Sequence, residues 1–180
     1  MKMLIDTTLC IECQACVVAC LQENSRENPW PRIKACTSFP KNCRHCAEPA
    51  CTAFCPSGAL KKTEAGVVTW EEELCLGCKL CLSFCPFGSV NFDLERGQPV
   101  KCLFCSERLK TGLEPACTAV CPTGARVFGE EEEIEKLARD KMAELKGKGR
   151  KAIFFNTDAH RDGIIILMES EEEHGFNLGV

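Results

Sequence analysis

Tyrosine is absent from the 180 residues of this chain, and its aromatic side chains are limited to 10 phenylalanines and 2 tryptophans. The apolar fraction of 45% includes 17 cysteines, so a conventional core of large side chains would be thin. The length allows one compact domain or two small ones. A chain of this composition needs internal cross-links, either disulfides or bound metal.

Long hydrophobic runs are also missing. The longest, residues 164–168, has the length of a β-strand and falls far short of the roughly 18 residues of a membrane span. The first ten residues, MKMLIDTTLC, contain neither an apolar signal region nor a twin arginine. We therefore expect a cytoplasmic protein without a transmembrane segment.

Nucleotide-binding motifs are missing as well: the sequence has neither G-x-G-x-x-G nor a P-loop. No nucleophile and base stand out, so we predict no catalytic residue. The formal net charge is −4 with neutral thiols, and ligating thiolates would make it more negative. That charge disfavours nucleic acid as a partner.

What the sequence does contain is cysteine in a repeated spacing. Each of four groups has two cysteines three residues apart, then a third, and a fourth four residues after the third; the last three groups end in Cys-Pro. The groups are Cys10, Cys13, Cys16 and Cys20; Cys43, Cys46, Cys51 and Cys55; Cys75, Cys78, Cys81 and Cys85; and Cys102, Cys105, Cys117 and Cys121.

Dense C-x-x-C repeats in a chain without a signal are typical of metal ligation, and the odd cysteine count also disfavours disulfides. A four-cysteine zinc site usually joins two C-x-x-C knuckles. Here two groups place three cysteines within seven residues, and three groups end in C-x3-C-P, which is typical of iron–sulfur ligation. The sixteen cysteines are therefore predicted to hold four [4Fe-4S] clusters.

The fourth cysteine of such a group usually ligates the second cluster of a two-cluster unit, so the groups must be paired. Two pairings are sensible. Neighbours can pair, the first group with the second and the third with the fourth. Alternatively the pairs can nest, with the second and third groups inside the first and fourth. The spacing alone does not decide.

The predicted secondary structure is α+β, with short strands leading into the cysteine loops and short helices joining the third and fourth cysteines. Strands are expected at residues 3–6 and 66–70 and after each Cys-Pro turn, a hairpin over residues 90–101, and helices over 15–21 and 79–84.

The longest predicted helix covers residues 130–146, with one apolar face formed by Ile134, Leu137, Ala138, Met142 and Leu145. That face either packs on its own domain or binds a partner. Two strands follow, at residues 152–155 and 164–168. They could add to the edge of a partner's sheet.

Several single residues permit two interpretations. The four cysteines of its group are complete without His45, so this residue is expected to support a ligand or lie at the surface. Cys36 is the leftover thiol, and an inert packing or surface role is favoured over ligation. Four cations either offset cluster charge or are ordinary solvated side chains: Arg44, Lys79, Lys101 and Arg108.

Two of the groups carry more than cysteines. Residues 43–56, CRHCAEPACTAFCP, resemble the second motif of the four-cluster electron-transfer subunits that accompany molybdenum or tungsten oxidoreductases. Residues 101–125, from Lys101-Cys102 to Cys121-Pro122-Thr123-Gly124-Ala125, resemble the fourth motif. Dimethyl sulfoxide reductase, formate dehydrogenase and polysulfide reductase have such subunits. Similar small subunits serve tungsten aldehyde oxidoreductases and benzoyl-CoA reductases. The resemblance covers about residues 3–128.

The resemblance implies two nested ferredoxin-like two-cluster units followed by a C-terminal helix and strand tail. Residues 1–42 and 91–128 would form the outer unit, residues 43–90 the inserted unit, and residues 129–180 the helix and docking tail. Four ligand sets follow from it: Cys10, Cys13, Cys16 and Cys121; Cys20, Cys102, Cys105 and Cys117; Cys43, Cys46, Cys51 and Cys85; and Cys55, Cys75, Cys78 and Cys81.

The implied function is to relay electrons between a catalytic molybdenum- or tungsten-pterin subunit and another redox partner, without a catalytic site in this chain. In such families the subunit can also be exported with a signal-bearing partner. The alternatives are a subunit of a hydrogenase or carbon monoxide dehydrogenase complex, a freely diffusing ferredoxin, and a chain that oligomerises through its tail and passes electrons between copies.

Overall fold

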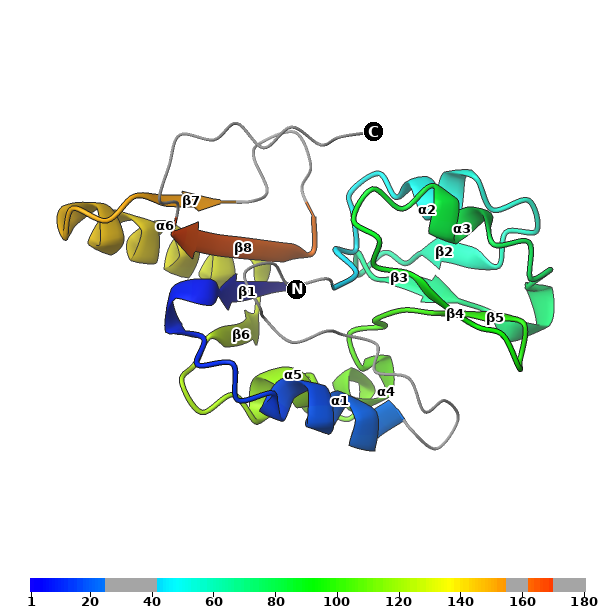
Figure 1. Cartoon of the computed structure of the whole chain (residues 1–180), viewed down its shortest axis with the longest axis horizontal. Coiled ribbons are helices and arrows are strands. Elements are labelled where there is room, and N and C mark those ends of the chain that lie inside the picture. Colours follow the sequence, from blue (N-terminus) through cyan, green and yellow to red (C-terminus); the bar gives the residue numbers. More distant parts are fainter. Residues whose placement is uncertain (25–41, 155–161, 170–180) are drawn as a thin grey trace.

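The computed structural model describes residues 1–24, 42–154 and 162–169, and it confirms the α+β fold class (Figure 1). Cys36 lies outside the described residues. None of the helices that the structure describes is long and apolar enough to cross a membrane. In chain order the elements are β1 (Lys2–Asp6), η1 (Thr7–Leu9), α1 (Ala15–Asn24), α2 (Ala50–Ala53), β2 (Leu60–Lys62), β3 (Val68–Trp70), η2 (Glu72–Leu74), α3 (Leu80–Ser83), β4 (Asn91–Asp93), β5 (Gln98–Val100), α4 (Ser106–Lys110), α5 (Ala116–Ala119), β6 (Arg126–Gly129), α6 (Glu131–Gly147), β7 (Ala152–Phe154) and β8 (Ile164–Glu169).

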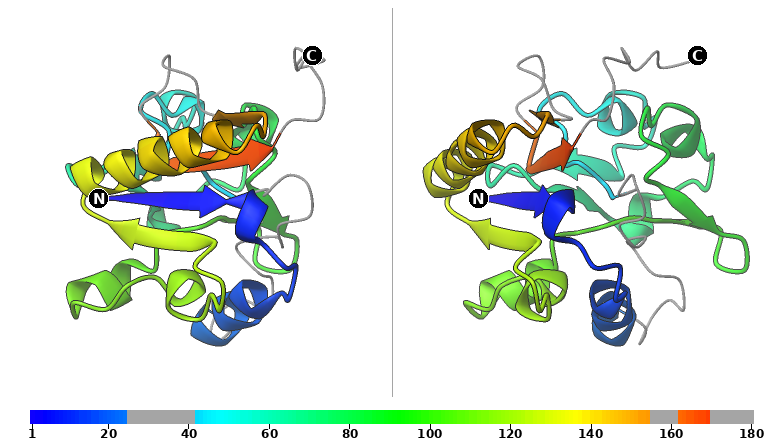
Figure 2. Two further views of the ribbon diagram at one scale, coloured as in Figure 1. Left: turned by 90° about the vertical axis from the view of Figure 1, so that its left-hand side faces the viewer. Right: turned by 60° about the vertical axis from the view of Figure 1, so that its left-hand side comes forward.

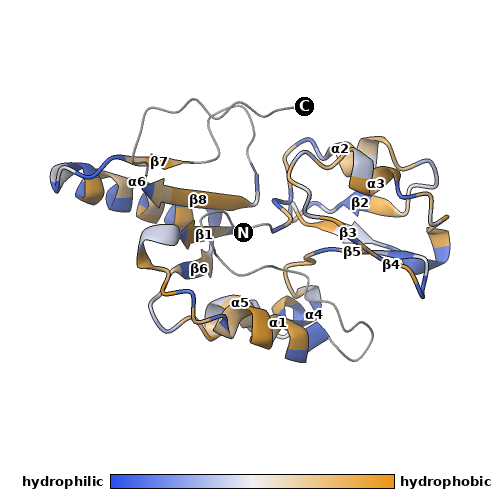
Figure 3. Cartoon of the chain, viewed as in Figure 1, coloured by the Kyte–Doolittle hydropathy of each residue, from blue (hydrophilic) through white to orange (hydrophobic). Residues whose placement is uncertain are grey.

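A four-stranded sheet with the order β6-β1-β8-β7 joins the two ends of the described chain. Strand β1 runs antiparallel to β6 and parallel to β8, and β7 is antiparallel to β8. All five residues of β1 are buried, as expected of a central strand with both faces covered. The hydropathy colours agree, since β1 and β8 are largely apolar (Figure 3).

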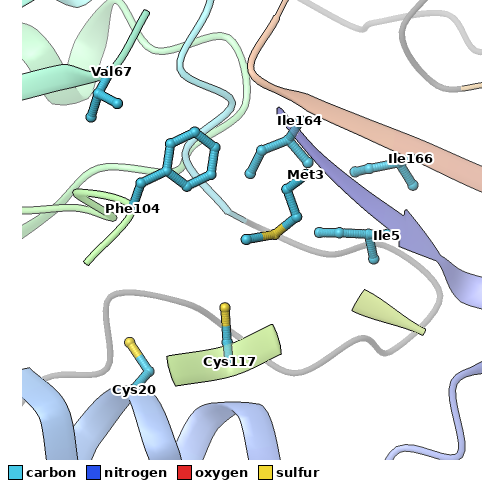
Figure 4. Packing of buried hydrophobic residues seen from close by; sticks show 8 residues of the cluster. All are labelled: Met3, Ile5, Cys20, Val67, Phe104, Cys117, Ile164 and Ile166. Atoms are coloured by element: carbon cyan, nitrogen blue, oxygen red, sulfur yellow. The ribbon is translucent and has the colours of Figure 1, made fainter. Parts of the chain in front are cut away.

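The two faces of this sheet pack against different parts of the molecule because successive side chains of a strand point to opposite sides. Leu4 and Leu167 pack beneath α6, with Ile134, Ala138, Leu145 and Ala152. The opposite face contributes Met3, Ile5, Ile164 and Ile166, which pack with Val67, Phe104, Cys20 and Cys117 (Figure 4). The sheet therefore lies directly against two of the cysteine groups.

Helix α6 lies within one residue of its predicted bounds and extends along the sheet (Figure 2). Its apolar face is buried against β1, β7 and β8, which confirms that the helix packs on its own domain. Strand β8 is hydrogen-bonded on both sides, by β1 and β7, so it has no free edge to offer a partner. Of the two C-terminal strands, only β7 lies at an edge of the sheet.

The remaining strands form two small sheets, β2 with β3 and β4 with β5, and the second is the predicted hairpin. A repeated turn precedes β2, β4 and β6. In each repeat a glycine after Cys-Pro has positive φ, 67° at Gly58, 54° at Gly88 and 65° at Gly124, which glycine adopts without strain. Its N–H donates to the carbonyl of the cysteine, at 3.2, 3.1 and 3.3 Å respectively.

Candidate metal centres

The four cysteine loops share one backbone feature. The second residue after the first cysteine has a left-handed conformation in every group: φ is 55° at Glu12, 50° at His45, 64° at Gly77 and 53° at Phe104. Three of these residues are not glycine, and such strain is found at sites where the loop conformation matters. The shared turn lies within the stretch of each loop whose first three cysteines face one site.

Three cavities each collect four thiols from two cysteine groups. Site A is lined by Cys10, Cys13, Cys16 and Cys121. Site B is lined by Cys20, Cys102, Cys105 and Cys117. Site D is lined by Cys55, Cys75, Cys78 and Cys81. In each cavity three thiols come from one group, and the other is the fourth cysteine of a different group.

The remaining thiols, Cys43, Cys46, Cys51 and Cys85, form site C. Burial, followed by the Asp162 carboxylate, raises the pKa of Cys46 to about 12. The other groups that add to this rise are the remaining members of site C, Cys43, Cys51 and Cys85, so these thiols are close enough to repel one another. The four sites agree with the nested pairing, although ligation itself stays a prediction.

The thiols of sites A, B and D surround cavities. In the part of the chain that the structure describes, no three cysteine, histidine or carboxylate side chains converge closely enough to bind a single metal ion. All sixteen grouped cysteines are free thiols. A cubane cluster, which occupies the space between four separate thiolates, fits such a donor set, and its iron would overcome the raised thiol pKa values.

In the last three groups the fourth cysteine begins the Cys-Pro turn, and hydrogen-bond donors surround its sulfur. At Cys55, burial raises the pKa, but the amides of Leu60, Ser57 and Ala59 and the Ser57 hydroxyl, 3.7 Å from Sγ, bring it below its ordinary value. At Cys121 burial also raises the pKa, but the Thr123 hydroxyl, 3.8 Å from Sγ, and the amides of Arg126, Thr123 and Ala125 bring it below its ordinary value. Cys85 lacks a hydroxyl at that position, and the N–H of Ser89 donates to its Sγ at 3.4 Å. Such donors favour thiolate and tune a bound cluster.

His45 is buried, which rules out the surface alternative. Its Nδ1 accepts the Val68 N–H at 3.0 Å, and its ring stacks on Phe104 with 4.1 Å between centroids. Burial, followed by the charges of Lys101 and Lys62, lowers its pKa well below 6.5, so the ring is neutral. His45 and Phe104 hold equivalent positions in groups two and four, and their stacking joins sites C and B.

The four predicted cations divide into two kinds. Arg44 and Lys101 are buried, which contradicts a solvated role for them. Arg44 lies 5.1 Å from the centre of the Phe87 ring, and although burial lowers its pKa to about 10, Asp162 and site C thiols oppose this. Arg108 forms an ion pair with Glu23 at 3.0 Å, and the exposed Lys79 lies 4.8 Å from the centre of the Phe92 ring.

Two residues near the sites were missed by the sequence analysis. Buried Arg126 lines site A, and its charge lowers the pKa of Cys117 against the larger effect of burial, which raises it. The signal for it was a charged residue where the other two Cys-Pro repeats have Leu60 and Val90. Trp70 lines site D, and its buried Nε1 has no acceptor among the described residues. No pattern in the sequence marked Trp70.

Short strands, a repeated Cys-Pro turn and four thiol-lined sites define an iron–sulfur protein of the ferredoxin-like class. Two family models match the chain, a 4Fe-4S dicluster domain over residues 34–131 and a 4Fe-4S binding domain over residues 7–22. The chain is 35% identical over 176 residues to the formate dehydrogenase-O iron–sulfur subunit of Escherichia coli, covering 81% of this chain and 58% of that subunit.

The electron transfer subunit PhsB of thiosulfate reductase from Salmonella typhi is 33% identical over 189 residues, covering 96% of this chain and 93% of that subunit. A hydrogenase-2 operon protein, HybA of E. coli O157:H7, is 34% identical over 180 residues, covering 78% of this chain and 55% of the relative. The chain therefore belongs to the family of iron–sulfur electron-transfer subunits that bind [4Fe-4S] clusters, as the resemblance implied.

Proposed function

We propose that this chain holds four [4Fe-4S] clusters, one at each of sites A to D, and conducts electrons through them. The observation that carries the proposal is the convergence of four thiols at each site from two separate cysteine groups. Sixteen thiolates are the number that four cubanes require. The site A and B ligands would belong to an outer unit of residues 1–42 and 91–128, and those of C and D to an inserted unit of residues 43–90.

The sites follow one another in a line. Electrostatic repulsion reaches from Cys16 of site A to Cys117 of site B, from Cys43 of site C to Cys102 of site B, and from Cys81 of site D to Cys51 of site C. Each of these pairs joins consecutive sites, which supports the order A–B–C–D. A linear order gives an electron one entry and one exit.

The partners proposed for the two ends are a catalytic molybdenum- or tungsten-pterin subunit and a second redox subunit. The formate dehydrogenase and thiosulfate reductase relatives support this assignment, and the hydrogenase-2 operon protein supports a hydrogenase complex as the alternative. Purification of the native complex with metal analysis distinguishes them: molybdenum or tungsten supports the first assignment, and nickel without either metal supports the second.

A cytoplasmic location remains a prediction, which cell fractionation tests.

The cluster count has its own test. The anaerobically purified holoprotein should contain about sixteen iron and sixteen sulfide atoms per chain, because each cubane has four of each. Its reduced form should give EPR signals of interacting [4Fe-4S] clusters. About four iron atoms per chain, or four non-interacting signals, would contradict the proposal.

A further inference from the structure

Lys101 is the last residue before group four, and its side chain is almost completely enclosed, with 2% exposed. The ammonium donates to the carbonyl oxygen of Val68 in β3 and to that of Cys102, at 2.8 Å for the latter. The side chain thus crosses from the end of β5 into the space between the inserted cysteine groups and group four. A cation held there needs a counter-charge, because an isolated charge is very costly to bury.

Elsewhere this chain supplies carboxylates for a buried ammonium. Lys2, which is also buried, is paired with Glu131 at 2.9 Å and with Glu135. Lys101 forms no ion pair with a carboxylate among the described residues. The adjacent His45 is neutral and supplies no negative charge. Among the described residues, the cysteines of sites B and C would supply negative charge beside Lys101 once they ligate clusters.

These thiolates belong to two different sites. On one side the ammonium donates to the carbonyl of Cys102, a residue of site B. On the other it donates to the carbonyl of Val68, whose N–H donates at 3.0 Å to Nδ1 of His45, the residue between Cys43 and Cys46 of site C. The His45 ring also stacks on Phe104 of the group-four loop, with 4.1 Å between ring centroids, so the loops of sites C and B meet beside Lys101. Lys101 therefore lies where an electron would pass between the second and third clusters of the proposed line.

We propose that the Lys101 ammonium is the shared counter-ion of the clusters at sites B and C and raises the reduction potentials of both. The proposal rests on the proposed function. Each cluster gains negative charge when it is reduced, and a buried cation stabilises that charge more than an exposed one does. Lys101 is a positioning residue in this scheme: it binds no metal, and by raising both potentials it makes the two central clusters easier to reduce.

The test is an EPR-monitored redox titration of the full-chain holoprotein carrying Lys101→Met, which removes the charge and keeps much of the side-chain volume. The potentials of two clusters should fall, with iron content equal to the wild type. Lys101→Arg, which retains the charge, should shift them less. The variants Cys20→Ala and Cys85→Ala, which remove ligands of sites B and C, identify the signals.

Lys62→Met is the matched control. Lys62 also donates to two carbonyls, those of Cys46 and Ala47 at 2.8 Å each, but its side chain is exposed, so solvent screens its charge. This substitution should move no potential as far as Lys101→Met does. Unchanged potentials in Lys101→Met, or an equal shift of all four clusters, would overturn the proposal while leaving the cluster count, and hence the proposed function, intact.

If Lys101→Met loses iron, the wild-type holoprotein provides a second measurement. With ¹⁵N-labelled lysine, pulsed EPR should detect hyperfine coupling between a lysine nitrogen and the reduced clusters of sites B and C. The same coupling should disappear in Lys101→Arg. Absence of the coupling from the wild type would overturn the proposal.

Discussion

At the scale of single residues, Gly77 shows how tightly one cysteine loop is packed. It has φ of 64°, and a Cβ added there would lie 3.0 Å from the carbonyl oxygen of Gly97. Gly77→Ala should therefore destabilise site D in two ways, by left-handed strain of about 1–2 kcal/mol and by the clash. Gly66→Ala isolates the first effect, because Gly66 has φ of 80° with no atom within 4 Å.

The measurement is the denaturant midpoint at which the cluster absorbance of the holoprotein disappears. The midpoint should fall further for Gly77→Ala than for Gly66→Ala. Equal midpoints for the two variants would show that the hairpin of β4 and β5 moves away without cost and does not constrain the loop.

Trp70 supports a second prediction at this scale. Its indole N–H lacks an acceptor among the described residues although Trp70 lines site D, and cluster sulfur accepts such hydrogen bonds. Trp70→Phe should leave the iron content unchanged and lower the potential of the site D cluster, because the hydrogen bond stabilises the reduced form. A redox titration checks this. An unchanged site D potential, or a shift at sites A and B as well, would contradict it.

Residues such as these separate what the sequence could predict from what it could not. The sixteen cysteines could be predicted as ligands because the cysteines of a cluster loop lie close together in the sequence, at a recognisable spacing. Trp70 and Arg126 reach their sites through strands β3 and β6, and Lys101 is enclosed by β3 and the group-four loop. Such neighbours depend on tertiary packing, which no spacing records.

At the scale of elements, the two C-terminal strands also show what the sequence could predict and what it could not. Both were predicted, but β8 pairs with β1, and the register of Met3 with Ile164 joins residues near opposite ends of the chain. The apolar pattern that indicates a strand does not say which strand it will pair with. The structure places β8 inside the sheet, so its apolar residues serve the core.

Ile166→Ala tests that role. Ile166 has 0% exposed and packs in the cluster that includes Cys20 and Cys117, so its truncation should lower the free energy of unfolding by about 2–5 kcal/mol and weaken site B. Ile153→Ala in β7, at 47% exposed, is the control and should change it by about 0.5 kcal/mol or less. Denaturant unfolding, with iron analysis, compares them. Equal effects would show that Ile166 contributes no more to stability than an exposed side chain does.

At the scale of the whole molecule, the order of the cysteine groups in the chain differs from their order in space. Group one meets group four at sites A and B, while groups two and three meet at sites C and D. The sequence left this choice open because the spacing within a group is the same for either pairing. Closing the outer unit requires the four-stranded sheet, in which β1 precedes group one and β6 follows group four.

Double substitutions distinguish the pairings. Under nested pairing Cys10 and Cys121 hold the same cluster, so Cys10→Ala, Cys121→Ala and the double variant should each lose at most about four iron atoms per chain, with no additional loss in the double variant. Under neighbour pairing Cys121 belongs with group three, and the two losses would add. The double variant of Cys10 and Cys75, whose residues lie in sites A and D, is the additive control. Additive losses for Cys10 and Cys121 would overturn the order A–B–C–D, since site A could not then contain a thiol from group four.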